Sequence, residues 1–340
     1  MLRQAFPAPP DAIETHMSWV FLTGDRAYKL KKPVTTPFLD HSTLAARRLD
    51  CHAELRLNQR LAPGVYLRTV PLTVGSDGNL ALDQPGRTVD WLVVMRRLPD
   101  GSLLQWQLTH DVRTPSAREI EQLIAHLVSF YRSSAGEPMS PDRYRNHLLG
   151  VLRLDRAELL RPERALDGEE IADLVTYLEE LLIGAPVLGP RSAHVVDGHG
   201  DLRPEHIVVR PEPLVIDRIT ADRRLRLVDP AYDLALLAVE CEHLGVPSVG
   251  DDMLAAYRTE ADDALPPSVD ALYRCLRATT RARLSLAHLG DGDRDAAKWL
   301  DRTDSYLAIA GRHLRRYHEE AVAGSDVDRS GADRSAIELE

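Results

Sequence analysis

The sequence has few cysteines, no long apolar run and no glycine-rich phosphate-binding motif. Its three cysteines are Cys51, Cys241 and Cys275, and none of them belongs to a Cys-x-x-Cys pair. An odd number of widely spaced cysteines argues against a disulfide framework and against a zinc site. Neither Gly-x-Gly-x-x-Gly nor Gly-x-x-x-x-Gly-Lys-Ser/Thr occurs, which excludes a Walker-type ATPase. We therefore expect reduced thiols in the core, and any phosphate-binding loop must use other residues.

No apolar run approaches the roughly 18 residues that span a bilayer, and residues 1–7 lack the apolar segment of a secretory signal. With 340 residues, of which 44% are hydrophobic, the chain is long enough to bury a substantial core. The composition predicts a globular protein of the cytoplasm that does not bind membranes.

The charge balance is acidic, with a formal net charge of −10. Nucleic acids and anionic membranes select a basic face, so we expect neither as a partner. Residues 233–340 hold 21 carboxylates against 13 Arg and Lys. This acidity suits a cationic substrate, and the alternative is an acidic surface that only keeps the helices soluble.

The chain divides into a strand-rich and a helix-rich part. Residues 13–34 predict strands, with a hairpin of 19–23 and 27–31 around a Gly-Asp turn. A helix over 43–61, capped by Ser42 or Asp40, and strands over 65–74 and 89–95 complete the first part, for which we expect five strands. Apolar residues at intervals of three and four then predict helices over the following segments: 116–133, 141–160, 167–182, 233–244, 253–260, 269–289 and 293–319.

The densest group of polar side chains lies at 197–206. It includes His199, Asp201 and His206, and Asp217 follows at the end of the short apolar run 213–216. That run predicts the second strand of a hairpin, which brings two loops face to face. Phosphoryl transfer needs such a pair, because one carboxylate orients the attacking hydroxyl and another holds the metal at the phosphates.

This pattern resembles a known family. His199-Gly200-Asp201, His206 five residues after the Asp, Asp217 and then Asp229-x-x-x-Asp233-Leu-Ala are similar to the catalytic segment of aminoglycoside and choline kinase-like phosphotransferases. These proteins are small-molecule relatives of protein kinases, and the opening residues 13–25 resemble their bacterial aminoglycoside phosphotransferase-like branch. Asp229 and Asp233 are expected to have structural roles.

The resemblance implies a bilobal protein kinase-like α+β fold. Residues 1–95 would form a nucleotide-binding lobe with an antiparallel sheet, 96–101 a hinge, and 102–320 a helical lobe that carries the catalytic and substrate sites. The polar segment 321–340 is expected to be disordered.

The resemblance also implies roles for the polar cluster. Asp201 would orient the substrate hydroxyl, His199 would orient the catalytic loop, and Asp217 would bind Mg²⁺ at the β- and γ-phosphates. His206 stands where the family has Asn. Because an imidazole suits Mn²⁺ better than Mg²⁺, His206 is a candidate metal ligand with Mn²⁺ as an alternative ion, and it could instead bond Asp201.

Candidate nucleotide-binding residues lie in the first part of the chain. Lys29 and Lys31 share one face of their strand and Lys32 takes the other. In the register of the resemblance Lys31 binds phosphate and pairs with Glu54, and Lys29 is the alternative. Ser18 with backbone amides would cover the phosphates, and the backbone of Met95, Arg96 and Arg97 would read the adenine.

The sequence thus predicts an enzyme that uses ATP to phosphorylate a hydroxyl of a small molecule, such as a sugar, an amino sugar or an aminoglycoside. One alternative is a kinase-like module that binds nucleotide with little or no turnover. Another is a metal-dependent hydrolase with His199, Asp201 and His206 as ligands and Asp217 as a bridge. The hydrolase would leave the N-terminal lysines and Glu54 without an explanation.

Overall fold

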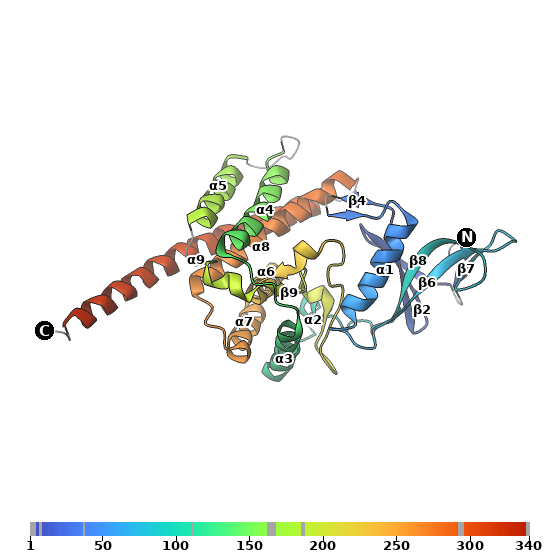
Figure 1. Cartoon of the computed structure of the whole chain (residues 1–340), viewed down its shortest axis with the longest axis horizontal. Helices are drawn as coiled ribbons and strands as arrows, with labels where there is room; N and C mark the ends of the chain where they lie inside the picture. Colours follow the sequence, from blue (N-terminus) through green and yellow to red (C-terminus); the bar gives the residue numbers. More distant parts are fainter. Residues whose placement is uncertain are drawn as a thin grey trace. The chain divides into compact units, whose positions relative to one another are not determined.

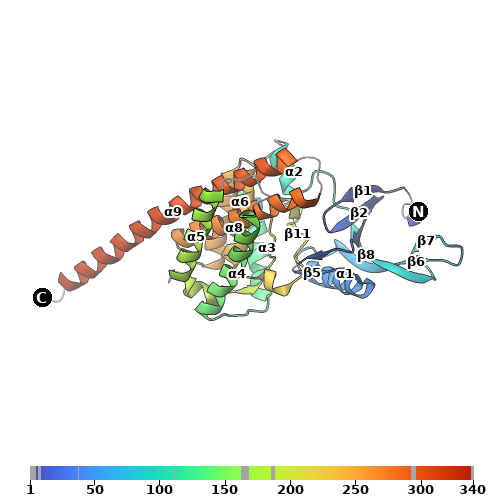
Figure 2. The ribbon, with the colours of Figure 1, turned by 90° about the horizontal axis from the view of Figure 1, so that it is seen from above.

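The computed structural model describes residues 5–6, 9–36, 38–110, 112–161, 168–184, 188–291 and 296–337, and the side chains of 290, 291 and 323–337 are not described. The chain forms two compact units, drawn in Figures 1 and 2. The first unit comprises residues 1–133 and 199–227, and the second comprises 134–198 and 228–340. The α+β composition, an antiparallel sheet followed by a mostly helical part, is as the sequence predicts.

The first unit is built on a six-stranded antiparallel sheet of order β1-β2-β3-β8-β6-β7. Its strands are β1 (Asp11–Glu14), β2 (Ser18–Thr23), β3 (Arg26–Lys31), β6 (Tyr66–Val74), β7 (Leu80–Leu82) and β8 (Arg87–Arg96). The expectation of five strands is wrong, because the turn region 75–86 contains the short edge strand β7. Leu80 and Leu82 place apolar side chains against the sheet core, which explains why this turn forms a strand.

Helix α1 (Leu44–Asn58) packs on one face of the sheet, against β6 and β8, as Figure 1 shows. Its N-cap is Thr43, whose side chain accepts a hydrogen bond from the Ala46 N–H, instead of the predicted Ser42 or Asp40. Cys51 from α1 and Val93 from β8 belong to one buried cluster on this face. Because Lys29 pairs with Val93 across β3 and β8, its side chain points to the same face, toward α1.

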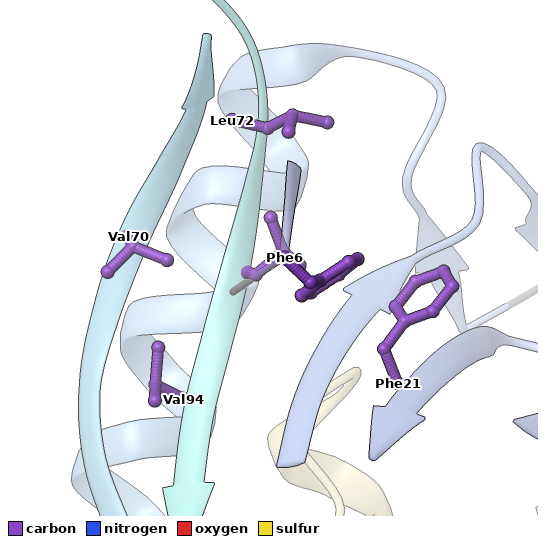
Figure 3. Packing of buried hydrophobic residues seen from close by; sticks show 6 residues of the cluster. Phe6, Phe21, Val70, Leu72 and Val94 are labelled. Carbon is purple, nitrogen blue, oxygen red and sulfur yellow. The ribbon is translucent and has the colours of Figure 1, made fainter. Parts of the chain in front are cut away.

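The opposite face of the sheet carries a second apolar cluster. Phe6, Phe21, Val70, Leu72 and Val94 meet there with Leu92, and Figure 3 shows their side chains gathered beside the strands. The rings of Phe6 and Phe21 have centroids 4.9 Å apart. A sheet covered on both faces gives β3 a fixed position relative to α1.

The remaining elements of the first unit lie between β3 and α1, after β8, or within 199–227. They are β4 (Thr35–Thr36), β5 (Leu39–Asp40), α2 (Leu104–Thr109), α3 (Ala117–Ser133), the 3₁₀ turns η4 (Pro204–His206) and η5 (Arg223–Arg226), β10 (Ile207–Val208) and β11 (Leu214–Val215). The structure places the catalytic segment in the same compact unit as the sheet. The lobe boundaries at 95 and 101 stay a prediction.

The second unit is helical. It contains α4 (Pro141–Leu159), α5 (Gly168–Gly184), η3 (Pro190–His194), β9 (Val196–Asp197), α6 (Pro230–His243), α7 (Pro247–Ala261), α8 (Pro267–Ala287), η6 (His288–Asp291) and α9 (Ala296–Ile337), and β12 (Leu227–Val228) lies at the boundary. Helix α8 packs against α4, α6 and α9. The backbone of 321–337 is helical and continues α9, and the disorder expected for 321–340 stays a prediction.

Asp229 and Asp233 both have structural partners in the second unit. Asp229 is the N-cap of α6, where it accepts a hydrogen bond from the Ala231 N–H, and it also accepts from Arg191 and Tyr273. Asp233 lies in the first turn of α6, buried, with Arg277 Nη2 3.4 Å away. Both residues therefore stabilise the start of α6.

Cys51, Cys241 and Cys275 are buried and unpaired, and burial raises the pKa of each thiol to about 12. They are inert core residues, as expected. None of the helices among the described residues combines the length and the apolarity needed to cross a membrane.

The apolar cluster in Figure 3 gives a stability prediction. We expect Phe21→Ala to lower the free energy of unfolding by about 3 kcal/mol, because it removes a ring that is only 4% exposed and leaves a cavity. Denaturant unfolding followed by tryptophan fluorescence measures the change. Leu49→Ala is the matched control, since Leu49 is 71% exposed, and its effect should stay within about 0.5 kcal/mol.

Candidate active site

A short hairpin brings the two predicted loops together. Strand β10 pairs antiparallel with β11, with Ile207 opposite Val215. The Ile216 N–H donates to the His206 carbonyl oxygen at 2.9 Å, which extends the pairing to the loops on either side. The predicted catalytic loop, which ends at His206, therefore lies beside the loop that begins at Asp217.

His199 holds these two loops together through its two ring nitrogens. It is fully buried, and its Nε2 donates to the Ile216 carbonyl oxygen at 3.0 Å. Its Nδ1 accepts from the Asp201 N–H at 3.2 Å. Burial lowers the pKa of His199 to about 3. Because both ring nitrogens are engaged, the neutral imidazole orients the loop and is not available as a metal ligand.

Gly200 is needed between His199 and Asp201. Its φ of 89° lies in the left-handed region, and a Cβ there would come within 2.8 Å of the Leu225 carbonyl oxygen. The loop can make this turn only without a side chain, so the backbone leads directly from the buried His199 to Asp201, which is partly exposed.

Both lysines of β3 reach Glu54 of α1. The Lys29 ammonium lies 3.0 Å from Glu54 Oε1 and 2.6 Å from Asp217 Oδ1. Lys31 pairs with Glu54 Oε2, and its ammonium lies 2.9 Å from Asp50 Oδ2. The predicted Lys31–Glu54 pair is thus present, and Lys29 shares the same carboxylate. Only Lys29 also contacts Asp217.

Electrostatics keeps these groups charged. Burial alone would lower the pKa of Lys29, but Asp217 and then Glu54 outweigh it and raise that pKa well above its usual range. Burial would also lower the pKa of Lys31, but the neighbouring carboxylates outweigh it and raise that pKa, with Glu54 having the larger effect. Desolvation favours protonation of Asp217, but the Lys29 ammonium holds the pKa of Asp217 well below its usual range.

The Asp217 loop is anchored to α1 and β6. Asp217 has a φ of 61°, which is uncommon for a residue other than glycine, and its N–H donates to the Tyr66 hydroxyl at 3.0 Å. The next N–H, of Arg218, donates to Asn58 Oδ1 at 2.8 Å, and Asn58 Nδ2 donates to the Glu54 carbonyl oxygen. Asn58 therefore joins the helix that carries Glu54 to the loop that carries Asp217.

His206 and Arg203 contact Asp201 from the other side. His206 Nδ1 lies 2.9 Å from the Asp201 carbonyl oxygen, and this contact assigns the proton to Nδ1. Its Nε2 lies 3.3 Å from Arg203 Nη2 and 3.9 Å from Asp217 Oδ2. Arg203 also donates to Asp201 Oδ2 through Nε at 3.0 Å and pairs with Glu205 at 2.5 Å. Of the two roles considered for His206, the bond to Asp201 is present.

Sequence reasoning missed Asn58 and Tyr66. Asn58 had one signal, since an asparagine four residues after Glu54 lies on the same face of the helix. Tyr66 had none, because its partner Asp217 comes from a segment that only the fold brings near. Arg203 has its partners within its own loop, at Asp201, Glu205 and His206.

Ser18 and the segment 95–97 lie at the edges of the same face. Ser18 is opposite Lys31 in the pairing of β2 with β3, and its buried Oγ has no hydrogen-bond partner among the described residues. The N–H groups of Arg96 and Arg97 donate to the carbonyl oxygens of Val65 and Asp25, both at 2.8 Å. Two of the backbone N–H groups that we expected to bind adenine therefore already have hydrogen-bond partners within the protein.

The donor set suits a hard divalent cation bound partly by phosphates. Within the described part of the chain, no group of three or more His, Cys, Asp or Glu side chains is arranged to hold a metal ion. Asp217 is nevertheless 44% exposed and keeps its charge. A single carboxylate completed by substrate phosphates and water is a normal Mg²⁺ site. Asp217 fits that description, whereas His206 Nε2 is a nitrogen that already faces Arg203.

Comparison with known proteins supports the resemblance. The model of the family described as "Phosphotransferase enzyme family" matches residues 19–272. Uncharacterised proteins of Mycobacterium tuberculosis and Mycobacterium bovis are 31% identical over 317 residues, which is 90% of this chain and 60% of theirs. The chain thus spans about 60% of the length of these curated relatives.

Solved structures share the fold. A choline kinase from Cryptosporidium parvum superposes with a TM-score of 0.57 at 13% identity, covering 95% of both chains. A choline/ethanolamine kinase family protein from Mesorhizobium loti gives 0.54 at 16% identity and 92% of both chains. A thermostable mutant of aminoglycoside phosphotransferase APH(4)-Ia gives 0.51 at 14% identity, covering 90% of this chain and 97% of the other. The predicted kinase-like α+β fold is confirmed.

The buried neutral His199 gives a pH prediction. Its pKa of about 3 lies below the ordinary value of 6.5, so the unfolded chain binds a proton that the folded chain does not. Stability is therefore lost as the pH falls from 6.5 toward 3, by up to about 1.4 kcal/mol per pH unit from this group. Unfolding free energies from pH 7 to 4 should fall less steeply in His199→Asn. An equal slope in wild type and variant would contradict this, and His110→Asn, at an exposed position, is the control.

Proposed function

Because this chain belongs to the phosphotransferase enzyme family, we propose that it transfers the γ-phosphate of ATP to a hydroxyl of a small molecule. The observation that carries the proposal is the Lys29 ammonium, which lies between Glu54 and Asp217. A lysine held by a helix glutamate and next to the metal-binding aspartate is the arrangement that kinases use at the nucleotide phosphates. Asp201 lies on the loop beside the one that carries Asp217.

The proposed reaction is an in-line transfer. The acceptor oxygen forms a bond to the γ-phosphorus while the bond from that phosphorus to the β,γ-bridging oxygen breaks. The electron pair of the broken bond stays with ADP, and the acceptor proton passes to the Asp201 carboxylate. Asp201 works mainly by aiming the hydroxyl, because the transition state of phosphoryl transfer is loose.

Lys29, in preference to Lys31, is proposed as the phosphate-binding lysine. The Lys29 ammonium is the one that contacts Asp217. If a metal ion neutralised the Asp217 carboxylate, this ammonium would be available to bind a phosphate. Lys31 lies between Glu54 and Asp50, and His41 Nε2 is 3.1 Å from the same Asp50 oxygen. Lys31 therefore fixes α1 against β3.

The nucleotide has further candidate contacts on this face. The unpartnered Ser18 Oγ fits a phosphate oxygen. Met95, Leu98 and Ile216 are partly buried apolar side chains of one cluster, and they offer a surface to a nucleobase. Since the N–H groups of Arg96 and Arg97 are used, the carbonyls of Met95, Arg96 and Arg97 and the Leu98 N–H are the proposed adenine contacts.

Mg²⁺ is the proposed metal, with Asp217 as its protein ligand. When bound, it neutralises charge on the β- and γ-phosphate oxygens. The carboxylates of the site outnumber its lysines and Arg203, which favours a divalent cation there. Mn²⁺ would serve in the same position.

The acceptor is proposed to be a sugar, an amino sugar or an aminoglycoside. The 21 carboxylates against 13 Arg and Lys in residues 233–340 support a cationic acceptor. Buried reduced thiols and the use of ATP fit a cytoplasmic protein. The hydrolase alternative is less well supported, because both nitrogens of His199 are engaged.

A transfer screen tests the proposal. Purified protein is incubated with γ-labelled ATP, Mg²⁺ or Mn²⁺, and a panel of sugars, amino sugars, aminoglycosides and choline-like alcohols. We expect labelled product from at least one acceptor, and Asp201→Asn should lower kcat by about 100- to 10,000-fold while ATP still raises the melting temperature. Transfer that survives in Asp201→Asn would contradict the mechanism. ATP binding with no transfer to any acceptor would identify the module without turnover.

The two lysines are distinguished by separate variants. We expect Lys29→Ala to weaken ATP·Mg²⁺ binding at least tenfold, which is about 1.4 kcal/mol. Lys31→Ala should change binding less and lower the unfolding free energy by about 3 kcal/mol, because it leaves Asp50 and Glu54 buried with one cation fewer. Calorimetric titration and denaturant unfolding measure the two effects.

Lys32→Ala is the matched control, since Lys32 lies on the other face and pairs with the exposed Glu14. It should change neither quantity appreciably. Stronger loss of ATP binding in Lys31→Ala than in Lys29→Ala would reverse the assignment.

A further inference from the structure

The Arg203 guanidinium lies against Asp201, the residue proposed to aim the acceptor hydroxyl. Its side chain is 17% exposed, and Nη2 lies 2.8 Å from Asp201 Oδ2 while Nη1 lies 2.5 Å from Glu205 Oε1. Asp201 and Glu205 are 26% and 34% exposed, so the group is reachable from solvent. The guanidinium therefore bridges the carboxylates of Asp201 and Glu205 at a solvent-accessible position.

His206 keeps the guanidinium in this position. Its Nδ1 proton is engaged by the Asp201 carbonyl oxygen, so the lone pair of Nε2 faces Arg203 Nη2 at 3.3 Å. The ring of His206 also lies beside that of the buried His199, with centroids 5.9 Å apart and an angle of 28° between the ring planes. An imidazole locked in this way accepts a hydrogen bond from Arg203 where it would otherwise offer a lone pair to a metal ion.

Kinases that carry Asn at this position use it, with the metal-binding Asp, to hold a second Mg²⁺. Here the corresponding atom, His206 Nε2, is used by Arg203, and no other His, Cys, Asp or Glu among the described residues completes a three-ligand group. The positive charge of a second metal and the positive charge of Arg203 would occupy the same region.

We propose that Arg203 takes the place of the second metal ion, so that the site works with one divalent cation at Asp217 and a guanidinium at the γ-phosphate. This inference rests on the proposed phosphotransfer. Arg203 is then a catalytic residue that stabilises charge on the phosphoryl oxygens, as a planar fork of N–H donors can. His206 is a positioning residue for Arg203.

The number of bound metal ions tests this without turnover. Electron paramagnetic resonance titration of Mn²⁺ into the protein with a non-hydrolysable ATP analogue should show one Mn²⁺ per chain. The double variant Arg203→Ala/His206→Asn, which restores the amide and removes the competing cation, should bind two. Two Mn²⁺ ions in the wild type, or one in the double variant, would overturn the inference.

Kinetics on the acceptor found by the screen gives a second readout. Arg203→Ala should lower kcat about 100-fold with little change in the KM for ATP, and Arg203→Lys should recover part of this loss. Arg224→Ala is the matched control, because Arg224 pairs with Asp222 at a position 75% exposed. An unchanged kcat in Arg203→Ala would reject the catalytic role.

The two failures are distinguishable. If the wild type neither binds the ATP analogue nor transfers phosphate, the proposed function itself is wrong. If it transfers phosphate and binds two Mn²⁺, the function stands and only the role of Arg203 fails.

Discussion

The rest of the site depends on the ion pairs that the Glu54 carboxylate makes with two lysines. This carboxylate is almost fully buried and is shared by Lys29 and Lys31, which come from alternate positions of one strand. Separating the partners of a buried ion pair is strongly destabilising. The cluster therefore holds α1 against β3 in one position. Asn58, one turn further along α1, joins the helix in that position to the loop of Asp217. Asp217, the proposed metal ligand, and Lys29, the proposed phosphate-binding lysine, are thereby positioned by the same helix.

The catalytic loop is fixed by a different means. His199 is neutral and buried, and it ties the backbone of Asp201 to that of Ile216. Gly200 permits the sharp turn between them. The loop thus reaches the Asp217 segment through backbone contacts that do not depend on charge. Arg203 and His206 place a guanidinium beside Asp201 within this loop.

Much of this was predictable from the sequence. Alternation along β3 placed both lysines on one face, and the apolar run before Asp217 predicted the β10–β11 hairpin. Most helices after residue 116 appeared close to their predicted bounds, but α7 begins six residues before the predicted 253 and α9 continues to Ile337 instead of ending at 319. The edge strand β7 was missed because three residues give too little periodicity. The choice between Lys29 and Lys31, and the partner of His206, depend on distances between segments far apart in the chain, which no local pattern encodes.

A double-mutant cycle on nucleotide binding tests the central role of Glu54 most directly. The dissociation constant of ATP·Mg²⁺ is measured for the wild type, Lys29→Ala, Glu54→Gln and the double variant, each checked for folding by circular dichroism. If Glu54 acts by holding Lys29 at the phosphates, the two changes are not additive, and the coupling free energy is about 1–2 kcal/mol. Additive effects, with a coupling free energy near zero, would contradict the account.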